Sequence, residues 1–297
     1  MCPKARLPIL EFRMRNVFLV ALVCGFTAAT LQVLAVPSAH ARVLAPHRAI
    51  YEITLDRSRG GSGVSDMAGR MVYELTGSEC EGYTQSMRFI TRMTNQEGVV
   101  SLTDMRSSSS EDANAKNFRF SSSQYKDSKL SESTTGDAAR AGPSGEVKVE
   151  LTKPAKKEME LKPNVFFPIQ HSIALLEVAA RGDAVFQADL YDGSEKGEKV
   201  YGTTAYIGRG RQAGFNKELA PAKNAERLDG LKAWPISISY FEPGSQKTDA
   251  VPVYELAFLY FENGVSRRLF IDYGEFAIRG SLKEIMFLEP GKCDGKK

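Results

Sequence analysis

The chain has 297 residues, of which 42% are hydrophobic and 25% are charged, with 39 Lys and Arg against 36 Asp and Glu. Residues 1–41 hold four of the basic and one of the acidic side chains, so the rest of the chain carries 35 of each sign and is formally neutral. Because phosphate neutralisation needs a basic excess or a basic stripe, this balance argues against nucleic acid as a partner. The only dense basic run, Lys153–Lys157, is typical of a solvated loop around Pro154.

The first 41 residues have the features of a secretory signal peptide. A basic segment comes first, residues 17–36 are almost wholly apolar, and Ala39-His40-Ala41 supplies the small residues of an A-x-A cleavage site. We expect cleavage after Ala41, export, and no membrane-integral segment in the mature protein. The alternative is an uncleaved membrane anchor, since the apolar run approaches the length that spans a bilayer.

Short strands with alternating or β-rich sequence are expected after the signal. Before the central helix they fall at Ala49–Leu55, Arg70–Leu75, Gln85–Met93, Val99–Met105, Asn117–Phe120 and Glu146–Leu151. Two Ser-rich segments, Ser107–Asp112 and Ser121–Ala141, have few large apolar side chains, and we expect exposed connections or edge strands there. No Pro- or Gly-rich linker divides the chain, which predicts a single domain over residues 42–297.

Residues 163–183 are the only stretch with a clear helical pattern. Pro168 fits the first turn of a helix and Gly182 ends it, which predicts a helix over about 166–181 with its core at Pro168–Arg181. On a helical wheel, the polar stripe is narrow and consists of Gln170, Glu177 and Arg181. The remaining circumference is apolar: Ile169, Ile173, Leu175, Leu176, Val178, Ala179 and Ala180. A helix of this kind must be enclosed, and with no second helix available we expect a curved sheet around it.

Strands resume after the helix. They are expected at Ala184–Tyr191, Lys199–Ile207, Trp234–Phe241, Val253–Phe261, Ser266–Tyr273, Phe276–Ile278 and Leu282–Leu288. Glu262-Asn263-Gly264 is the strongest hairpin signal, with weaker ones at Asp192-Gly193 and Tyr273-Gly274. Consecutive hairpins make a meander, and a meander this long curls. The predicted fold class is all-β and mainly antiparallel: a single curled, many-stranded β-spiral, an open barrel-like sheet wrapped around one helix.

The segment Tyr254–Phe261 is apolar on both faces apart from Glu255. Such a strand is packed on both faces. One face can cover the helix, while the other needs a second layer, a partner or a lipid-like ligand. The side chains expected to line the helix or a cavity beside it are Ile169, His171, Ile173 and Leu176.

Two cysteines, Cys80 and Cys293, remain after the signal is removed. In an oxidising compartment an even pair is best interpreted as one disulfide, with two free thiols as the alternative. The bridge would tie an early hairpin to the C-terminus and stabilise the fold by up to about 5 kcal/mol in the loop-entropy account. In an open meander the first and last strands would be edges, and the bridge would fasten them.

Candidate catalytic and metal-binding groups are few. After residue 41 the chain has two histidines, His47 and His171, so a zinc or iron site would have to be built mostly from carboxylates. His171 could act as a general base, although a core or capping histidine bonded to backbone is commoner at such a position. Residues 60–64 do not complete a nucleophile elbow, and Gly208–Gly214 has the wrong spacing for a phosphate loop and is expected to be a glycine turn. We predict no catalytic residue, no cofactor and no metal.

Several short segments, taken in order, resemble the EipB-like cell-envelope integrity family of Gram-negative bacteria. They are His47-Arg48-Ala49-Ile50-Tyr51 with Leu55, Phe167-Pro168-x-x-His171, Leu190-Tyr191-Asp192-Gly193-Ser194 and a cysteine near each end. The resemblance covers essentially all of residues 42–297. It implies a periplasmic, curled antiparallel β-spiral with one helix and one disulfide, similar in shape to the periplasmic lipoprotein carriers. It also implies support of envelope integrity, and it brings no catalytic activity or ligand.

Three hypotheses follow. The first is a non-enzymatic periplasmic protein that supports the envelope by binding an apolar or amphipathic ligand in its curl, or a lipid, lipoprotein or envelope protein partner. The second is an envelope hydrolase or transferase that uses His171 with carboxylates. The third is a scaffold whose outer surface binds another protein while the helix fills the curl. The surroundings of His171 and the space beside the helix distinguish them.

Overall fold

The computed structural model describes residues 43–141, 145–244 and 250–293, all of which belong to one compact unit, His40–Lys297. The expected signal peptide and its cleavage site lie outside the described residues. In these three ranges, no helix is both long enough and apolar enough to cross a membrane.

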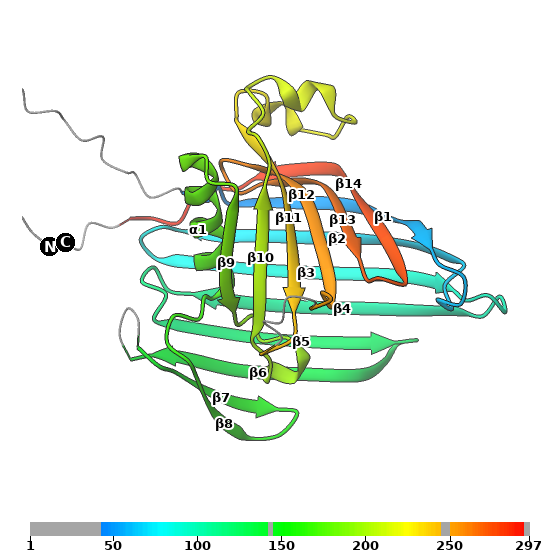
Figure 1. The fold of residues 1–297 in the computed structure, drawn as a ribbon, viewed down its shortest axis with the longest axis horizontal. Coiled ribbons are helices and arrows are strands. Elements are labelled where there is room, and N and C mark those ends of the chain that lie inside the picture. Colours follow the sequence, from blue (N-terminus) through cyan, green and yellow to red (C-terminus); the bar gives the residue numbers. More distant parts are fainter. Residues whose placement is uncertain (1–42, 142–144, 245–249, 294–297) are drawn as a thin grey trace, which may run out of the picture. The chain divides into compact units, whose positions relative to one another are not determined.

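Fourteen described strands form one sheet in which hydrogen-bonded neighbours are antiparallel (Figure 1). The first half contains β1 (His47–Ser58), β2 (Asp66–Ser78), β3 (Gly82–Thr94), β4 (Val100–Glu111), β5 (Asn117–Lys126), β6 (Lys129–Arg140), β7 (Val147–Lys153) and β8 (Lys157–Leu161). The second half contains β9 (Val185–Leu190), β10 (Tyr201–Ile207), β11 (Ala233–Phe241), β12 (Tyr254–Phe261), β13 (Ser266–Asp272) and β14 (Phe276–Phe287). The predicted all-β, open, curled sheet with one helix is confirmed.

The two edges of the sheet are consecutive strands in the chain. The strand order runs from β8 to β1, then β14, then down to β9, and α1 (Pro168–Arg181) connects the two edges. β1 and β14 pair along their lengths, with His47 opposite Phe287 and Ser58 opposite Phe276. The expectation that the first and last strands are edges is therefore wrong. Hairpin signals describe only sequence neighbours, whereas this pairing joins opposite ends of the chain.

Both edges are protected against pairing with another chain. β8 has only five residues, and its Lys157, Glu158 and Glu160 are exposed. A short, charged edge strand disfavours edge-to-edge association. At β9, the Phe166 amide donates to the Asp189 carbonyl at 2.7 Å, so the segment before α1 covers part of that edge.

The Ser-rich segments are regular strands with a partner on each side, contrary to our expectation. Ser107–Glu111 completes β4, and most of residues 121–141 lie in β5 and β6. β6 and β8 were not predicted at all, and the runs 276–278 and 282–288 form one strand with a register shift opposite Ile50 and Tyr51. Side-chain bonds such as Gln85 Nε2 to Ser109 Oγ at 3.1 Å help the serines fit a pleated surface. Long partner strands thus override a weak local β propensity.

The helix has the predicted core. α1 spans Pro168–Arg181 and ends at Gly182, whose φ of 87° only glycine adopts readily. Glu177 and Arg181 are exposed as the polar stripe requires. Ala180, assigned to the apolar side, is exposed too, so the helix is open to solvent on a wider arc than expected.

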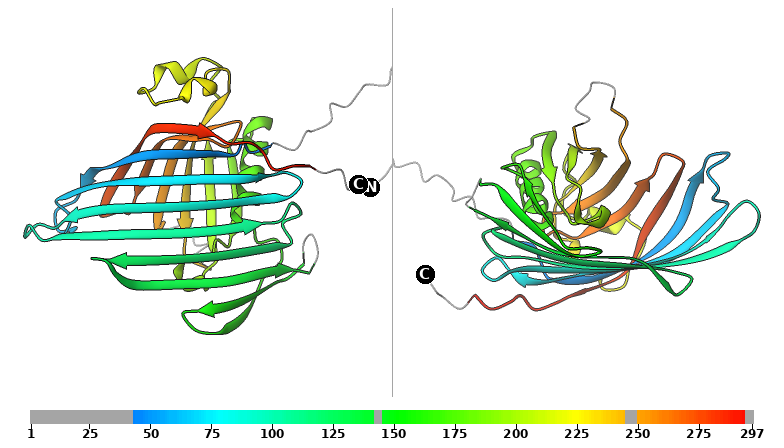
Figure 2. Two further views of the ribbon diagram at one scale, coloured as in Figure 1. Left: turned by 180° about the vertical axis from the view of Figure 1, so that it is seen from behind. Right: turned by 90° about the horizontal axis from the view of Figure 1, so that it is seen from below.

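The second half of the sheet lies over one face of the long strands, together with α1 (Figure 2). Leu75 and Tyr83 of the first half share a buried cluster with Leu176 of the helix and Trp234 of β11. We call the face of β1–β4 that bears Leu75 and Tyr83 the inner face and the opposite one the outer face.

Candidate functional site

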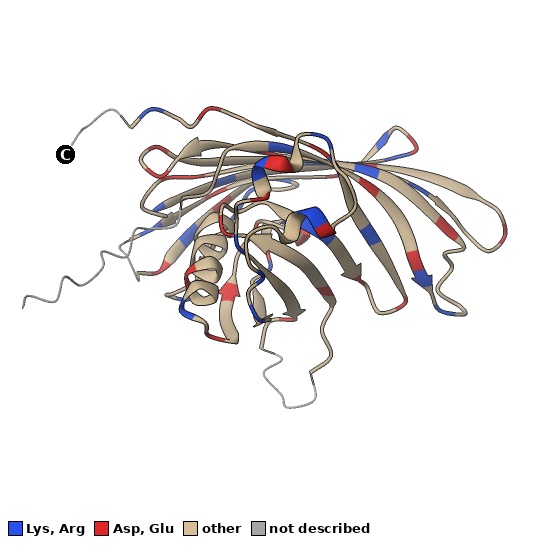
Figure 3. Ribbon diagram, turned by 90° about the horizontal axis from the view of Figure 1, so that it is seen from above, with Lys and Arg blue, Asp and Glu red and all other residues tan. Residues whose placement is uncertain are grey.

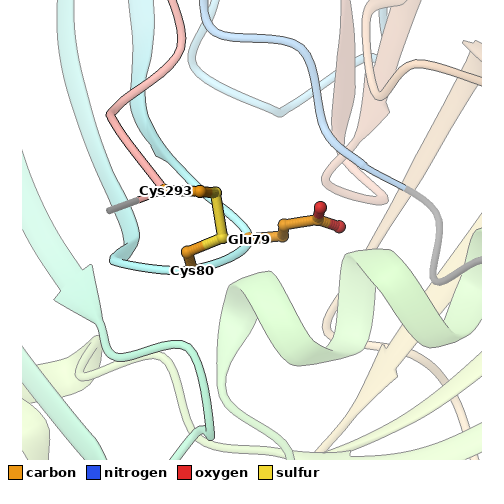
Figure 4. A group of neighbouring side chains, drawn as sticks. All are labelled: Glu79, Cys80 and Cys293. Atoms are coloured by element: carbon orange, nitrogen blue, oxygen red, sulfur yellow. A yellow bond between two sulfur atoms is a disulfide. The ribbon is translucent and has the colours of Figure 1, made fainter. Parts of the chain in front are cut away.

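A disulfide joins Cys80, in the turn between β2 and β3, to Cys293, which follows β14 (Figure 4). The two Cα atoms are 5.4 Å apart and 213 residues apart in sequence. The C-terminal segment also bonds to the same hairpin through the Gly291 amide and the Gly77 carbonyl at 3.0 Å. Glu79 lies close to both sulfur atoms. Since those sulfurs are bonded to each other, they are not available as thiolate metal ligands.

The N-terminus of α1 is capped by a side chain from a distant strand. Phe167 occupies the cap position without a side-chain bond of its own. Instead, the Glu111 carboxylate of β4 accepts the Ile169 amide at 2.5 Å and the Gln170 amide at 3.1 Å. Burial raises the pKa of Glu111 to about 7, while the bonds from the two amides act in the opposite direction.

Arg140 of β6 holds the segment that enters the helix. Its guanidinium donates to the Val165 carbonyl at 2.6 Å and to the Ala115 carbonyl at 3.2 Å. It also lies over the Phe167 ring at 4.9 Å. Glu111 and Arg140 together, which we call the helix clasp, fix α1 to the first half of the sheet. No local pattern in the sequence indicates the clasp, because Glu111 precedes Ile169 by 58 residues.

His171 is sealed in the core. It is 4% exposed, its Nε2 lies 3.2 Å from Thr203 Oγ1, and its ring packs near Phe166 and Phe186. Burial lowers the pKa of His171 to about 4, so the imidazole is neutral at pH 7. Thr203 in turn donates to the Ala188 carbonyl at 2.8 Å. Among the residues that the structure describes, no carboxylate bonds to His171, whereas the hydrolase alternative requires one.

The side chains expected to line a cavity belong mainly to the core. Leu176 is 0% exposed and Ile169 is 6% exposed, and both side chains of α1 belong to the main buried cluster. Of the four side chains expected there, only Ile173 is half-buried. Ile169, His171 and Leu176 therefore offer little accessible apolar surface.

The Leu190-Tyr191-Asp192-Gly193-Ser194 segment serves packing. Tyr191 is 0% exposed, donates its hydroxyl to the Gly197 carbonyl at 2.8 Å, and meets Phe118 and Phe120 edge-on. Gly193 has a φ of 73°, and a Cβ there would lie 2.3 Å from the Phe120 ring. The segment thus fastens the chain after β9 onto β5 of the first half.

The inner face of β1–β4 is almost free of charge. Its residues are the odd-numbered ones at 47–55, 67–77, 83–93 and 101–111, as register and alternating burial show. Glu111 of the helix clasp is the only Asp, Glu, Lys or Arg among them. Met71, Phe89 and Met105 stand opposite one another across β2, β3 and β4, and all three are half-buried.

Polarity on this face changes across the strands. Beside the Met71–Phe89–Met105 row the next strand offers Gln124, and Met87 is followed by Ser107 and then Ser122. Along these two rows, apolar side chains give way to uncharged hydroxyl and amide groups by β5, whereas nearer its start the same face of β5 bears the buried Phe118 and Phe120. We call this surface the inner-face gradient.

The outer face bears charged side chains that pair with one another. It has two shallow depressions of about 530 and 450 Å³ over β1–β5. Arg88 and Arg106 both contact Asp104, at 2.8 and 2.7 Å, and their hydrogen bonds lower the pKa of Asp104 to about 2. Arg48 pairs with Glu74 at 2.5 Å. These charges satisfy one another, which leaves the outer depressions without a converging set of reactive groups.

An open antiparallel sheet that curls over one helix, with a disulfide between the β2–β3 turn and the segment after β14, defines a β-spiral. The family model described as EipB-like matches residues 38–289, and the chain belongs to this family. It is 38% identical over 258 residues to the Cell envelope integrity protein EipB of Brucella abortus (strain 2308), with 87% of this chain and 89% of that protein covered.

A crystal structure from Brucella abortus, described as a β-barrel-like protein of domain of unknown function DUF1849, has a similar fold. The TM-score is 0.75 at 35% identity, and the match covers 83% of this chain and 99% of that chain. The resemblance read from the short segments is thereby confirmed.

Proposed function

We propose that this protein supports the integrity of the cell envelope from the periplasm, as a non-enzymatic protein whose inner face binds the apolar part of an amphipathic ligand. The name of its relative supports the envelope role. The export signal expected in residues 1–41 and the single disulfide agree with an oxidising compartment outside the cytoplasm. The inner-face gradient is the observation that carries the binding proposal.

The inner-face gradient has the side chains expected of a surface that binds an acyl chain. Burying one CH₂ group is favourable by about 0.8 kcal/mol, so a chain laid along a half-buried apolar row gains affinity with each carbon. Methionine adapts to ligands of different shape, which suits Met71 and Met105. The uncharged Ser107, Ser122 and Gln124 beyond them can bond to ester or hydroxyl groups without demanding a counter-ion.

The hydrolase alternative receives no support from its candidate base. His171 is enclosed by Thr203, Phe166 and Phe186, and its lowered pKa makes it a poor proton acceptor at neutral pH.

Either a lipid or the acyl group of a lipoprotein has the chemistry to bind the inner-face gradient. A globular protein partner would instead need a larger flat contact area.

Displacement of an apolar fluorescent probe, N-phenyl-1-naphthylamine, tests the proposal. We expect phospholipid to displace the probe from the exported protein, and Met71→Gln combined with Met105→Gln to weaken probe binding on the order of tenfold. Gln matches Met in length, so packing is disturbed little. Ile50→Gln on the outer face is the matched control and should bind normally. Equal binding by all three proteins would contradict the proposal.

A further inference from the structure

The connection between β10 and β11, residues 208–232, forms a lobe that projects from the ends of these strands (Figures 1 and 2). It contains two short 3₁₀ turns, η2 (Phe215–Glu218) and η3 (Ala225–Leu228). The Gly208–Gly214 segment, expected to be a glycine turn, is its stem. There the Gly208 amide donates to the Pro235 carbonyl at 2.8 Å, and Arg211 pairs with Ala233.

This lobe, which we call the basic lobe, holds a local excess of positive charge. It has six basic side chains against three acidic ones, although the chain after residue 41 is balanced. The basic ones are Arg209, Arg211, Lys217, Lys223, Arg227 and Lys232, and the acidic ones are Glu218, Glu226 and Asp229. The remainder of the mature chain therefore carries a net charge of about −3. The protein has one positive end on an otherwise slightly negative body.

Several of these cations have no carboxylate partner. Arg209, Arg211 and Arg227 are exposed, and none of them forms an ion pair within the described residues. Lys217 reaches Asp229 only at 3.9 Å. On the outer face of the sheet, by contrast, guanidinium groups such as Arg88 are matched by carboxylates. Figure 3 shows both basic and acidic residues on the lobe's two short turns.

A buried hydrogen-bond network holds the lobe in place. Arg267 of β13 is 4% exposed and donates to the Asn216 side-chain oxygen and to the Ala220 carbonyl. Asn216 donates in turn to the Ala225 carbonyl at 2.9 Å and to Asp229 at 2.7 Å. A buried and satisfied network of this kind holds the cations in place before any partner binds, so little ordering entropy opposes binding.

A second anchor fixes the lobe to β14. The Lys223 amide donates to the Lys283 carbonyl at 2.9 Å, and its carbonyl accepts the Ile285 amide at 3.0 Å. Apolar groups accompany the cations: Phe215 and Leu219 are half-buried, and Arg211 lies over the Phe215 ring at 5.2 Å. Arginine beside a partly exposed aromatic ring is a combination that suits the polar–apolar boundary of a lipid surface.

We propose that the basic lobe docks the protein on an anionic lipid surface by contacting the phosphate groups of several headgroups. The lobe offers exposed cations on its stem, at Arg209 and Arg211, and on η3, at Arg227. Separated cations match a surface of many charges better than a single enclosed anion. Each such cation strengthens partitioning to an anionic surface by about fivefold. The location at a membrane rests on the proposed envelope function, but the docking contact does not involve the inner-face gradient.

Vesicle co-sedimentation of the exported full-length protein tests this proposal. We expect binding to equimolar phosphatidylcholine–phosphatidylglycerol vesicles and none to pure phosphatidylcholine. Arg209→Gln with Arg211→Gln removes two cations and should weaken binding by about 25-fold. Lys148→Gln with Lys162→Gln removes the same charge from exposed positions on and beside the β7–β8 edge and should bind as the unchanged protein does. High salt should abolish binding, since the Debye length falls to about 3 Å at 1 M.

Three results would overturn the docking proposal, two of them in the binding measurement itself. One is equal binding by the Arg209/Arg211 variant and its control, and the other is the absence of binding to anionic vesicles. Competition by inorganic phosphate beyond that of chloride at equal ionic strength would indicate a discrete anion site instead, which also contradicts it. The lobe variant should still bind the naphthylamine probe, so failure here is distinguishable from failure of the proposed function.

Discussion

Removing the carboxylate of the helix clasp should destabilise α1 in proportion to the bonds it makes. Glu111→Ala leaves the Ile169 and Gln170 amides without their acceptor. A buried donor without a partner costs about 1–3 kcal/mol, and Gln170 is only half-buried, so we expect a loss of about 2–4 kcal/mol. For a domain of this size that corresponds to a drop in Tm of about 2–4 °C for each kcal/mol.

The same residue predicts a pH dependence. The pKa of Glu111 rises from 4.5 to about 7 on folding because burial disfavours the carboxylate. A group whose pKa is raised by folding contributes stability fully below its unfolded pKa and loses it as the pH rises through the folded pKa. The contribution is on the order of 3 kcal/mol at most. Glu111→Gln removes the titration, so the stability advantage of the unchanged protein over this variant should shrink between about pH 5 and about pH 8.

Urea unfolding of the unchanged protein, Glu111→Ala and Glu111→Gln across this pH range measures both effects. Glu146→Gln, the same substitution at an exposed position before β7, is the matched control. An advantage over Glu111→Gln that stays constant or grows as the pH rises would refute the reasoning about burial. Unchanged stability of Glu111→Ala would refute the capping role.

The remaining predictions concern the core, the chemistry and the disulfide. Leu176→Asp should unfold or aggregate the protein, because it buries an unpaired charge, whereas Glu177→Ala should change the free energy of unfolding by less than about 0.5 kcal/mol; thermal melts of both measure this. His171→Ala should complement a deletion strain at matched folded levels, and a stable variant that fails to complement would favour an enzyme. Cys80→Ser and Cys293→Ser should be equally destabilised, by up to about 5 kcal/mol, in denaturant unfolding and limited proteolysis, since each removes the same bond.

Local patterns in the sequence predicted what depends on local chemistry. Alternation located most strands, the wheel and Gly182 located α1, and a pair of cysteines indicated the bridge. The closure of β1 on β14 and the cap from Glu111 were out of reach, because each joins positions remote in sequence. The Ser-rich strands were missed because their stability comes from neighbours on both sides.

The proposed ligand surface also depends on contacts between segments remote in sequence. The side chains expected to line the helix or a cavity beside it, Ile169, His171, Ile173 and Leu176, are buried or half-buried where α1 packs against both halves of the sheet. The half-buried Met71–Phe89–Met105 row lies on β2–β4, and its Met71 and Phe89 pack against a second buried cluster that contains no residue of α1. A wheel shows which side of a helix is apolar, but it does not show which of two packed surfaces remains accessible.

Native mass spectrometry of protein purified from the periplasm tests the central claim most directly. The account predicts a co-purifying mass of phospholipid or acylated ligand on the unchanged protein and on Ile50→Gln, and its loss from Met71→Gln combined with Met105→Gln. An unliganded protein in all three preparations, or an adduct retained equally by the inner-face variant, would contradict binding at the inner-face gradient.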